Sequence, residues 1–213
     1  MFITMNTTAS SPAAFSNFLS DFQSTKKVFV ETTPTLSRKA DFQKKFDYSA
    51  KGHLKAIDIV YKEFFGKNSK ILDVTGKDSY LDTQIGVDYI VEVENPRLQK
   101  EVQFWIQERF RTVKYQSYQS VTLIENNCYS GNLSEVYKSK AQFLVYGYYD
   151  EETEILVQVV VVSLPQLFQK IAMNQINFEI IKNKQTNQNF ISVKFDELRK
   201  HGLIVYEFDF GAN

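Results

Sequence analysis

The 213-residue chain is poor in cysteine, carries no excess of either charge and lacks any long apolar run. Its single cysteine, Cys128, has no partner for an internal disulfide, which predicts a reducing compartment and a cytoplasmic protein. One cysteine and two histidines cannot supply the four ligands of a structural zinc site. These shortages exclude a disulfide-stapled secreted scaffold and a zinc-stabilised fold.

The charges cancel, since 25 basic and 25 acidic residues give a formal net charge of +0. Proteins that coat nucleic acid non-specifically usually have a net basic surface, so this composition argues against that class and leaves room for a local basic groove. The longest apolar run, Val159–Leu164, is too short to span a membrane. Met1–Ala14 has neither the basic start nor the apolar stretch of a signal peptide.

Apolar residues are plentiful, at 43% of the chain with 18 Phe and 12 Tyr, which predicts a folded core. The Thr-rich stretch Glu31–Ser37 contains Pro34 and has the composition of a linker. We therefore expect a partly disordered N-terminal arm over residues 1–37, with a short helix at Pro12–Phe22. One domain is expected over residues 38–213.

Periodic patterns predict a mixed order of helices and strands. Ser49–Phe65 places apolar residues such as Leu54 and Ile57 at helical spacing, and Gly66 is typical of a helix end. Strands are expected over Lys70–Val74, Val87–Glu94, Glu101–Arg111, Phe143–Tyr149, Ile155–Val162, Phe190–Phe195 and Leu203–Phe208, and helical segments over Leu164–Met173 and Asp196–His201. The predicted fold class is α/β, with a mixed central sheet flanked by helices.

The turn signal Asn95-Pro96-Arg97 joins two of these strands, which we expect to pair as an antiparallel hairpin. In the second strand, alternation sends successive side chains to opposite faces. The apolar face, with one carboxylate, comprises Val102, Phe104, Ile106, Glu108 and Phe110. The polar face comprises Gln103, Trp105, Gln107, Arg109 and Arg111. Asp88 opens the first strand just after Gly86, where its carboxylate is expected to lean towards the polar face.

The motif Gly86-Val87-Asp88, followed by a hairpin and then by Gln107-Glu108-Arg109, resembles the PD-(D/E)xK nuclease superfamily. In that family a helix precedes three strands, an Asp begins the second strand, and an acid-x-Lys motif lies on the third. The resemblance covers about Ser49–Val162 and implies a restriction-endonuclease-like core. It also implies an endonuclease that acts on DNA with Mg²⁺ or Mn²⁺, in defence, mobile-element or repair biology.

The resemblance assigns catalysis to Asp88, Gln107 and Arg109, and metal binding to Asp88, Gln107 and the backbone carbonyl of Glu108. Gln107 stands where the family has an acid, and Arg109 stands where it has lysine. Because a guanidinium keeps its proton at neutral pH, Arg109 can stabilise charge but cannot act as a general base. Supporting oxygen ligands are expected from Asp58, which lies at the edge of the helical apolar stripe, and from Asp82 or Gln84.

Phosphate contacts need only cations within reach of the backbone. The candidates are Arg97, Arg111, Lys114, Lys138 and Lys140. A homodimer is expected if both strands of a duplex are cut, because two-fold symmetry matches the duplex.

Each candidate also has a structural interpretation, and the two stay open at this point. Asp88 can cap a turn, and Gln107 and Arg109 can form the solvated face of an edge strand, with Arg109 paired to Glu92. Glu108 can be satisfied by a cation such as Arg111 or Lys114. The alternative function is therefore a catalytically inactive nuclease-like scaffold that acts as a binding or assembly protein. The zero net charge and the missing lysine both favour it.

Overall fold

The computed structural model describes residues 36–76, 79–95, 97, 99–126, 135–183 and 188–212. The chain divides into two compact units, Met1–Thr33 and Pro34–Asn213, and every described residue belongs to the second. The helix expected at Pro12–Phe22 and the lone Cys128 lie outside the described residues. Among the helices that are described, none is both long enough and apolar enough to cross a membrane.

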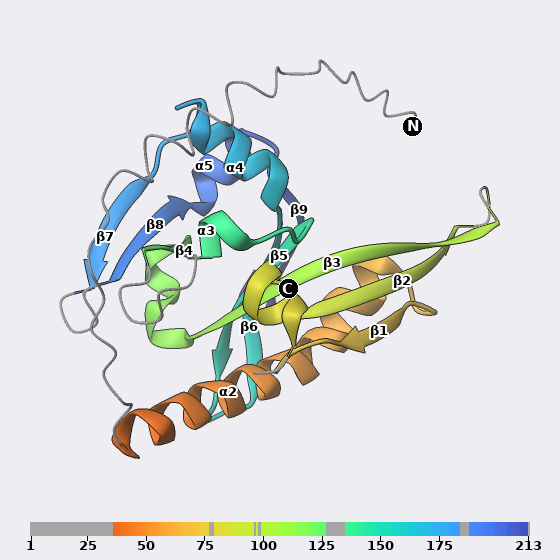
Figure 1. The fold of residues 1–213 in the computed structure, drawn as a ribbon, viewed down its shortest axis with the longest axis horizontal. Coiled ribbons are helices and arrows are strands. Elements are labelled where there is room, and N and C mark those ends of the chain that lie inside the picture. Colours follow the sequence, from red (N-terminus) through yellow and green to blue (C-terminus); the bar gives the residue numbers. More distant parts are fainter. Residues whose placement is uncertain are drawn as a thin grey trace. The chain divides into compact units, whose positions relative to one another are not determined.

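A six-stranded mixed sheet with the order β1-β2-β3-β5-β6-β9 runs through the second unit (Figure 1). Its strands are β1 Lys70–Asp73, β2 Tyr89–Asn95, β3 Lys100–Thr112, β5 Phe143–Asp150, β6 Ile155–Ser163 and β9 Ile204–Asp209. The strands β2 and β3 form the expected antiparallel hairpin, and β3 and β5 are parallel. The remaining neighbours are antiparallel. The predicted α/β class with a mixed sheet is confirmed.

A second sheet, which the sequence patterns do not predict, contains three antiparallel strands in the order β4-β8-β7. Its strands are β4 Ser120–Asn126, β7 Glu179–Asn183 and β8 Gln188–Lys194, of which only β8 is anticipated. The inner side chains Val121 and Leu123 of β4 and Ile191 of β8 share one apolar core with Leu144 and Val160 of the large sheet. The two sheets are therefore joined by a common core.

The opposite face of the large sheet is covered by one long helix, α2 Leu36–Ala56, which continues as the π-helix η1 Ile57–Phe65. It ends before Gly66, which has a φ of 106°, a backbone conformation that glycine adopts readily. The predicted end of the helix is therefore confirmed. The start lies earlier than the predicted Ser49. Leu54, expected in the apolar stripe, is 65% exposed, because it lies two residues before Ala56, which is buried against the sheet. The remaining helical segments are η2 Leu81–Ile85, η3 Val113–Tyr118, α3 Glu135–Lys138, α4 Leu164–Ala172, α5 Phe195–Lys200 and η4 Phe210–Ala212.

Alternation along β3 follows the sequence pattern. Ile106 and Phe110 pack into the core under α2 and η1, whereas Trp105 packs against the core shared with the small sheet. On one edge β2 pairs with Lys100–Ile106, and on the other edge β5 pairs with Ile106–Thr112. The candidate polar residues Gln107 and Arg109 therefore lie in the half of β3 that pairs with β5.

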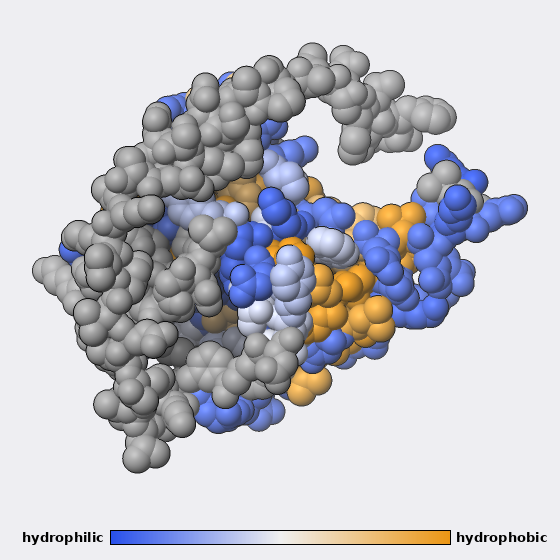
Figure 2. All heavy atoms as spheres, in the orientation of Figure 1, coloured by the Kyte–Doolittle hydropathy of each residue, from blue (hydrophilic) through white to orange (hydrophobic). Residues whose placement is uncertain are grey.

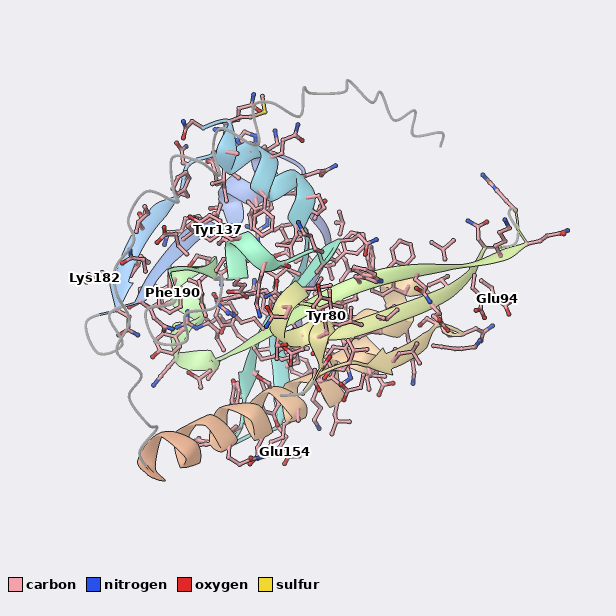
Figure 3. The ribbon with its side chains drawn as sticks, viewed as in Figure 1. Tyr80, Glu94, Tyr137, Glu154, Lys182 and Phe190 are labelled. Atoms are coloured by element: carbon pink, nitrogen blue, oxygen red, sulfur yellow. The ribbon has the colours of Figure 1, made fainter. Side chains whose placement is uncertain are left out.

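Some apolar side chains stay at the surface of both sheets. Figure 2 shows an apolar area over β1 and β2, where Leu72 is 43% exposed. On β7, Ile180 is 62% and Ile181 45% exposed, and Lys182 lies at the outer rim of the small sheet (Figure 3). Strands β1 and β7 are outermost in their respective sheets.

Phe110 fills the narrow gap between α2 and the sheet, and two glycines make the space. A Cβ atom on Gly52 of α2 would lie 2.6 Å from Cγ of Phe110, and a Cβ atom on Gly147 of β5 would lie 3.0 Å from its Cδ1. Contacts this short force the ring or the helix to move. The helix can approach the sheet only because both positions lack a side chain.

We predict that Gly52→Val lowers the free energy of unfolding by about 1–3 kcal/mol, because the added methyl groups overpack the site of Phe110. Urea denaturation followed by circular dichroism measures the change. Replacing the exposed Leu54 by valine is the matched control on the same helix and should have little effect. Adding Phe110→Leu to Gly52→Val should recover part of the loss. A Gly52→Val protein as stable as wild type would contradict the packing described here.

Candidate functional site

Asp88 lies directly before β2 and faces β3. The register pairs Tyr89 with Ile106, so one step further places Asp88 opposite Gln107. The backbone N–H of Asp88 donates to the carbonyl of Ile106 at 2.8 Å. Its carboxylate oxygen Oδ2 accepts the backbone N–H of Glu108 at 2.7 Å. Asp88 and Gln107 are thus cross-strand neighbours, as the hairpin pattern suggests.

The side chains of Gln107 and Arg109 both end on Glu135, the first residue of α3. Its carboxylate is only 5% exposed and forms an ion pair with Nη2 of Arg109 at 2.6 Å. The same oxygen accepts the backbone N–H of Ile124 at 2.7 Å, and the other oxygen accepts the amide N–H of Gln107. One buried carboxylate therefore receives three donors, two from β3 and one from β4.

The amide oxygen of Gln107 and Nη1 of Arg109 are also bonded within the protein. The amide oxygen of Gln107 accepts the hydroxyl of Ser139 at 2.9 Å, and Nη1 of Arg109 donates to the carbonyl of Thr122 at 2.8 Å. Gln107 is only 6% exposed, so the interpretation as a solvated edge is wrong. The pairing of Arg109 with Glu92 is wrong as well, because Glu92 accepts the amide of Gln103 at 2.8 Å.

Glu108 points to the other face of the sheet, towards the helix. Both of its carboxylate oxygens lie 3.0 Å from Nδ1 of His53, and one of them accepts the hydroxyl of Tyr61. The His53 ring stacks on Tyr89 with 3.8 Å between centroids. Burial and the neighbouring Glu108 raise the pKa of Tyr61 well above its usual value. The expected pairing of Glu108 with Arg111 or Lys114 is therefore wrong.

The surroundings of Asp88 disfavour the ionised form of its carboxyl group. Burial raises its pKa to about 8, the hydrogen bond from the backbone of Glu108 opposes this shift, and repulsion from Asp82, Glu108 and Glu135 adds to it. At neutral pH the protonated form of Asp88 therefore predominates. A carboxyl group with such a pKa is common at functional sites, although structural networks produce it too.

Of the three supporting residues, only Asp82 is close to Asp88. Its Oδ2 accepts the backbone N–H of Gly76 at 2.9 Å, and its charge contributes to the raised pKa of Asp88. Gln84 is exposed. Asp58 exposes 72% of its side chain and pairs with Lys62 at 2.5 Å on the helix that covers the other face. The expectation that Asp58 joins the site is not met, because Ala56 and Val60, two positions to either side, are the residues buried against the sheet.

The five candidate phosphate-binding residues divide between three places. Two of them lie near the polar cluster formed by Asp88, Gln107, Arg109 and Glu135. There Lys138 donates to the carbonyls of Asp82 and Thr83, each at 3.0 Å, and Lys140 is exposed. At the end of β3, Arg111 donates to Oγ1 of Thr122 at 2.9 Å, and both Arg111 and Lys114 lie over the ring of Tyr115. Arg97 is exposed in the hairpin loop.

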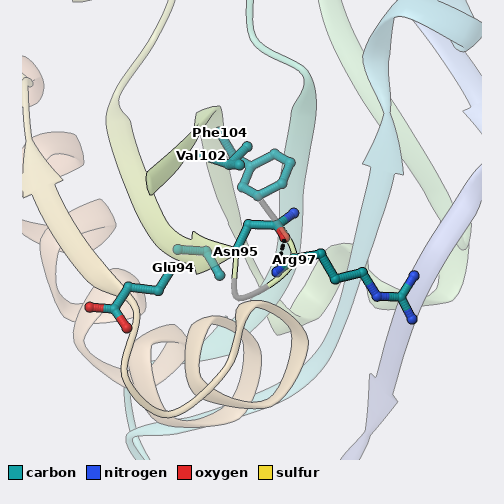
Figure 4. Close-up of a pocket in the computed structure, with 6 residues that line it drawn as sticks. Glu94, Asn95, Arg97, Val102 and Phe104 are labelled. Atoms are coloured by element: carbon teal, nitrogen blue, oxygen red, sulfur yellow. Dashed lines mark hydrogen bonds between the residues drawn. The ribbon is translucent and has the colours of Figure 1, made fainter. Parts of the chain in front are cut away.

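Arg97 borders a hollow of about 470 Å³ near the tip of the hairpin (Figure 4). Its lining residues are Val93, Glu94, Asn95, Arg97, Val102 and Phe104. The backbone N–H of Arg97 donates to the side chain of Asn95 at 3.0 Å, while the charged ends of Glu94 and Arg97 point away from each other. The hollow contains none of the predicted catalytic residues.

Most of the atoms predicted to bind a divalent ion already have partners in this arrangement. Mg²⁺ and Mn²⁺ need several available oxygen ligands, usually including one or two carboxylates. Both ends of the Gln107 amide and both oxygens of Glu135 are already bonded, and Oδ2 of Asp88 is used by Glu108. Within the described ranges, no three His, Cys, Asp or Glu residues are grouped so that they could hold a metal ion.

Glu135 is the residue of this cluster that sequence reasoning misses. It lies 28 positions after Gln107, in a Lys- and Glu-containing segment that has the composition of a solvated connection. Nothing local in the sequence shows that its carboxylate is buried. Glu135 reaches β3 only because α3 lies beside β4 in the folded protein.

Comparison of the chain with models of protein families, with curated proteins and with solved structures gives no match.

We predict that Glu135→Ala lowers the free energy of unfolding by about 3 kcal/mol, because it leaves the Arg109 charge and the Gln107 amide without their acceptor. Chemical denaturation measures the change. Glu101→Ala is the matched control, since Glu101 forms an exposed ion pair with Lys70 and its loss should matter little. Equal effects of the two substitutions would show that the buried ion pair is not structural.

We predict that Asp88 makes stability fall as pH rises. The unfolded carboxyl loses its proton near its usual pKa of 3.8, whereas the folded one holds it up to about 8. Between these values the free energy of unfolding should decrease by up to about 1.4 kcal/mol per pH unit. Denaturation at several pH values tests this. The slope should be smaller in Asp88→Asn, which cannot ionise, and unchanged in the surface control Asp58→Asn. Identical slopes in wild type and Asp88→Asn would overturn the assignment.

Proposed function

We propose that this chain is a catalytically inactive, nuclease-like scaffold that acts as a binding or assembly protein. The order of its elements supports the architectural part of the proposal. A helix precedes β1, β2 and β3, Asp88 stands immediately before β2, and Gln107 and Arg109 lie on β3. This is the order that the resemblance to the PD-(D/E)xK superfamily implies.

The functional part of the proposal rests on the contacts of the Glu135 carboxylate. Its carboxylate binds the guanidinium of Arg109 and the amide of Gln107, the two side chains that a nuclease would direct at a metal ion and a phosphate. A phosphate brought to Arg109 would have to displace a buried, hydrogen-bonded carboxylate. Breaking such a pair leaves a buried charge without a partner and is costly.

The protonation of Asp88 supports the same proposal. A metal ligand must be deprotonated, and the pKa of about 8 keeps this carboxyl largely neutral at physiological pH. Arg109 also supports an inactive site, because a guanidinium cannot accept a proton from an attacking water. The cluster then serves to hold β3, β4 and α3 together.

The second candidate is the metal-dependent endonuclease acting on DNA, with Mg²⁺ or Mn²⁺ and a homodimer if both strands are cut. The position of Asp88 opposite Gln107 favours this candidate. It would require Gln107 and Arg109 to leave Glu135 when metal and DNA bind.

Incubation with supercoiled plasmid DNA and Mg²⁺ or Mn²⁺ distinguishes the two functions. We predict that wild type, Asp88→Asn and Arg109→Lys all leave the plasmid intact, because Glu135 continues to hold the side chain at position 109 and no ion is held at Asp88. Arg109→Lys is informative because it restores the lysine of the family motif. Nicking by wild type that Asp88→Asn abolishes would establish the endonuclease and reject the scaffold.

A further inference from the structure

The strands β1 and β7 each form an outer edge of their sheet. An outermost strand directs alternate backbone N–H and C=O groups away from its sheet, where another strand can pair with them. Among the described residues no strand pairs with the outer side of either β1 or β7. Both also expose apolar side chains, with Leu72 on β1 at 43% and Ile180 on β7 at 62%. Such edges are pairing surfaces unless something covers them.

The sequences of the two edges are complementary when they are aligned in parallel. Strand β1 reads Lys-Ile-Leu-Asp from Lys70 to Asp73, and β7 reads Glu-Ile-Ile-Lys from Glu179 to Lys182. A parallel register of Lys70 with Glu179 places an opposite charge at each end and two apolar pairs between them. The antiparallel alignment instead opposes Asp73 to Glu179 and Lys70 to Lys182. Opposite charges across neighbouring strands stabilise pairing and like charges destabilise it.

The charged groups are available for this pairing. The side chains of Glu179 and Lys182 make no hydrogen bond or ion pair with another residue that the structure describes. Lys70 is 62% exposed and holds only the exposed Glu101. Asp73 is exposed, and only its Oδ1 is used, by Thr75. None of the four is buried in a way that would prevent a contact with a second molecule.

We propose that β7 of one copy of this chain pairs in parallel with β1 of a second copy, in the register Lys70 to Glu179. Figure 1 shows β1 and β7 on opposite sides of the described unit, so a single copy cannot join its own two edges. After the contact forms, one copy keeps a free β1 and the other keeps a free β7. The contact is therefore head-to-tail, and it extends into a chain or closes into a ring. The inference does not depend on whether the Glu135 cluster has a catalytic role.

Sedimentation velocity of the full chain at increasing concentration tests the proposal. The wild-type protein should pass from monomer through dimer to larger species. The single charge reversal Glu179→Lys should weaken association by about threefold or more, because Lys70 then faces a lysine at 179 in the parallel register and Lys182 in the antiparallel one. The single reversal Lys70→Glu on the other edge should do the same, because an acid then faces Glu179 in the parallel register and Asp73 still faces Glu179 in the antiparallel one. Swapping Asp58→Lys with Lys62→Glu, an exposed pair on η1, is the matched control and should leave association unchanged.

The decisive sample is the equimolar mixture of the two reversed proteins. Each reversed edge then meets a complementary reversed edge, so association should return to the wild-type level. Circular dichroism verifies that each variant is folded. A wild-type protein that stays monomeric at every concentration, or a mixture that stays as dissociated as its components, would overturn the proposal. Because the readout is mass, its failure is distinct from any result of the plasmid assay.

Discussion

The buried carboxylate of Glu135 is the interaction on which the arrangement around β3 depends. It accepts donors from Gln107 and Arg109 on the large sheet and from the backbone of Ile124 on the small sheet. Arg109 strengthens the same junction by donating to Thr122 of β4. Because a buried charge is tolerated only when it is paired and hydrogen-bonded, these partners are fixed by Glu135. The two sheets are thus tied by polar bonds as well as by their common core.

The same strand carries a second buried acid on its opposite face. Glu108 binds His53 and Tyr61 and so connects β3 to the covering helix, while its backbone N–H holds Asp88. Alternation along one strand therefore anchors a helix on one face and a second sheet on the other. Burial of Asp88, together with repulsion from the neighbouring acids, explains why its proton is retained. Asp88, Gln107 and Arg109, the side chains expected to form a nuclease site, thereby belong to a structural network.

The sequence predicts those features that depend on local periodicity. The hairpin of β2 and β3, the alternation of its faces and the cross-strand position of Asp88 and Gln107 all follow from a period of two. Glu135 could not be predicted, because its burial results from a contact between segments far apart in the chain. The sequence pattern misplaces Asp58 because the small residue Ala56 and Val60, rather than Leu54, pack on the sheet. The short strand β7 has too few residues to give a clear alternating pattern.

A crystal structure determined in the presence of Mn²⁺, with anomalous diffraction data, tests the central claim most directly. The account predicts that Arg109 and Gln107 stay bonded to Glu135 and that no anomalous peak lies beside Asp88. A Mn²⁺ ion bound by Asp88, with Arg109 released from Glu135, would contradict it and would establish a metal site at this position.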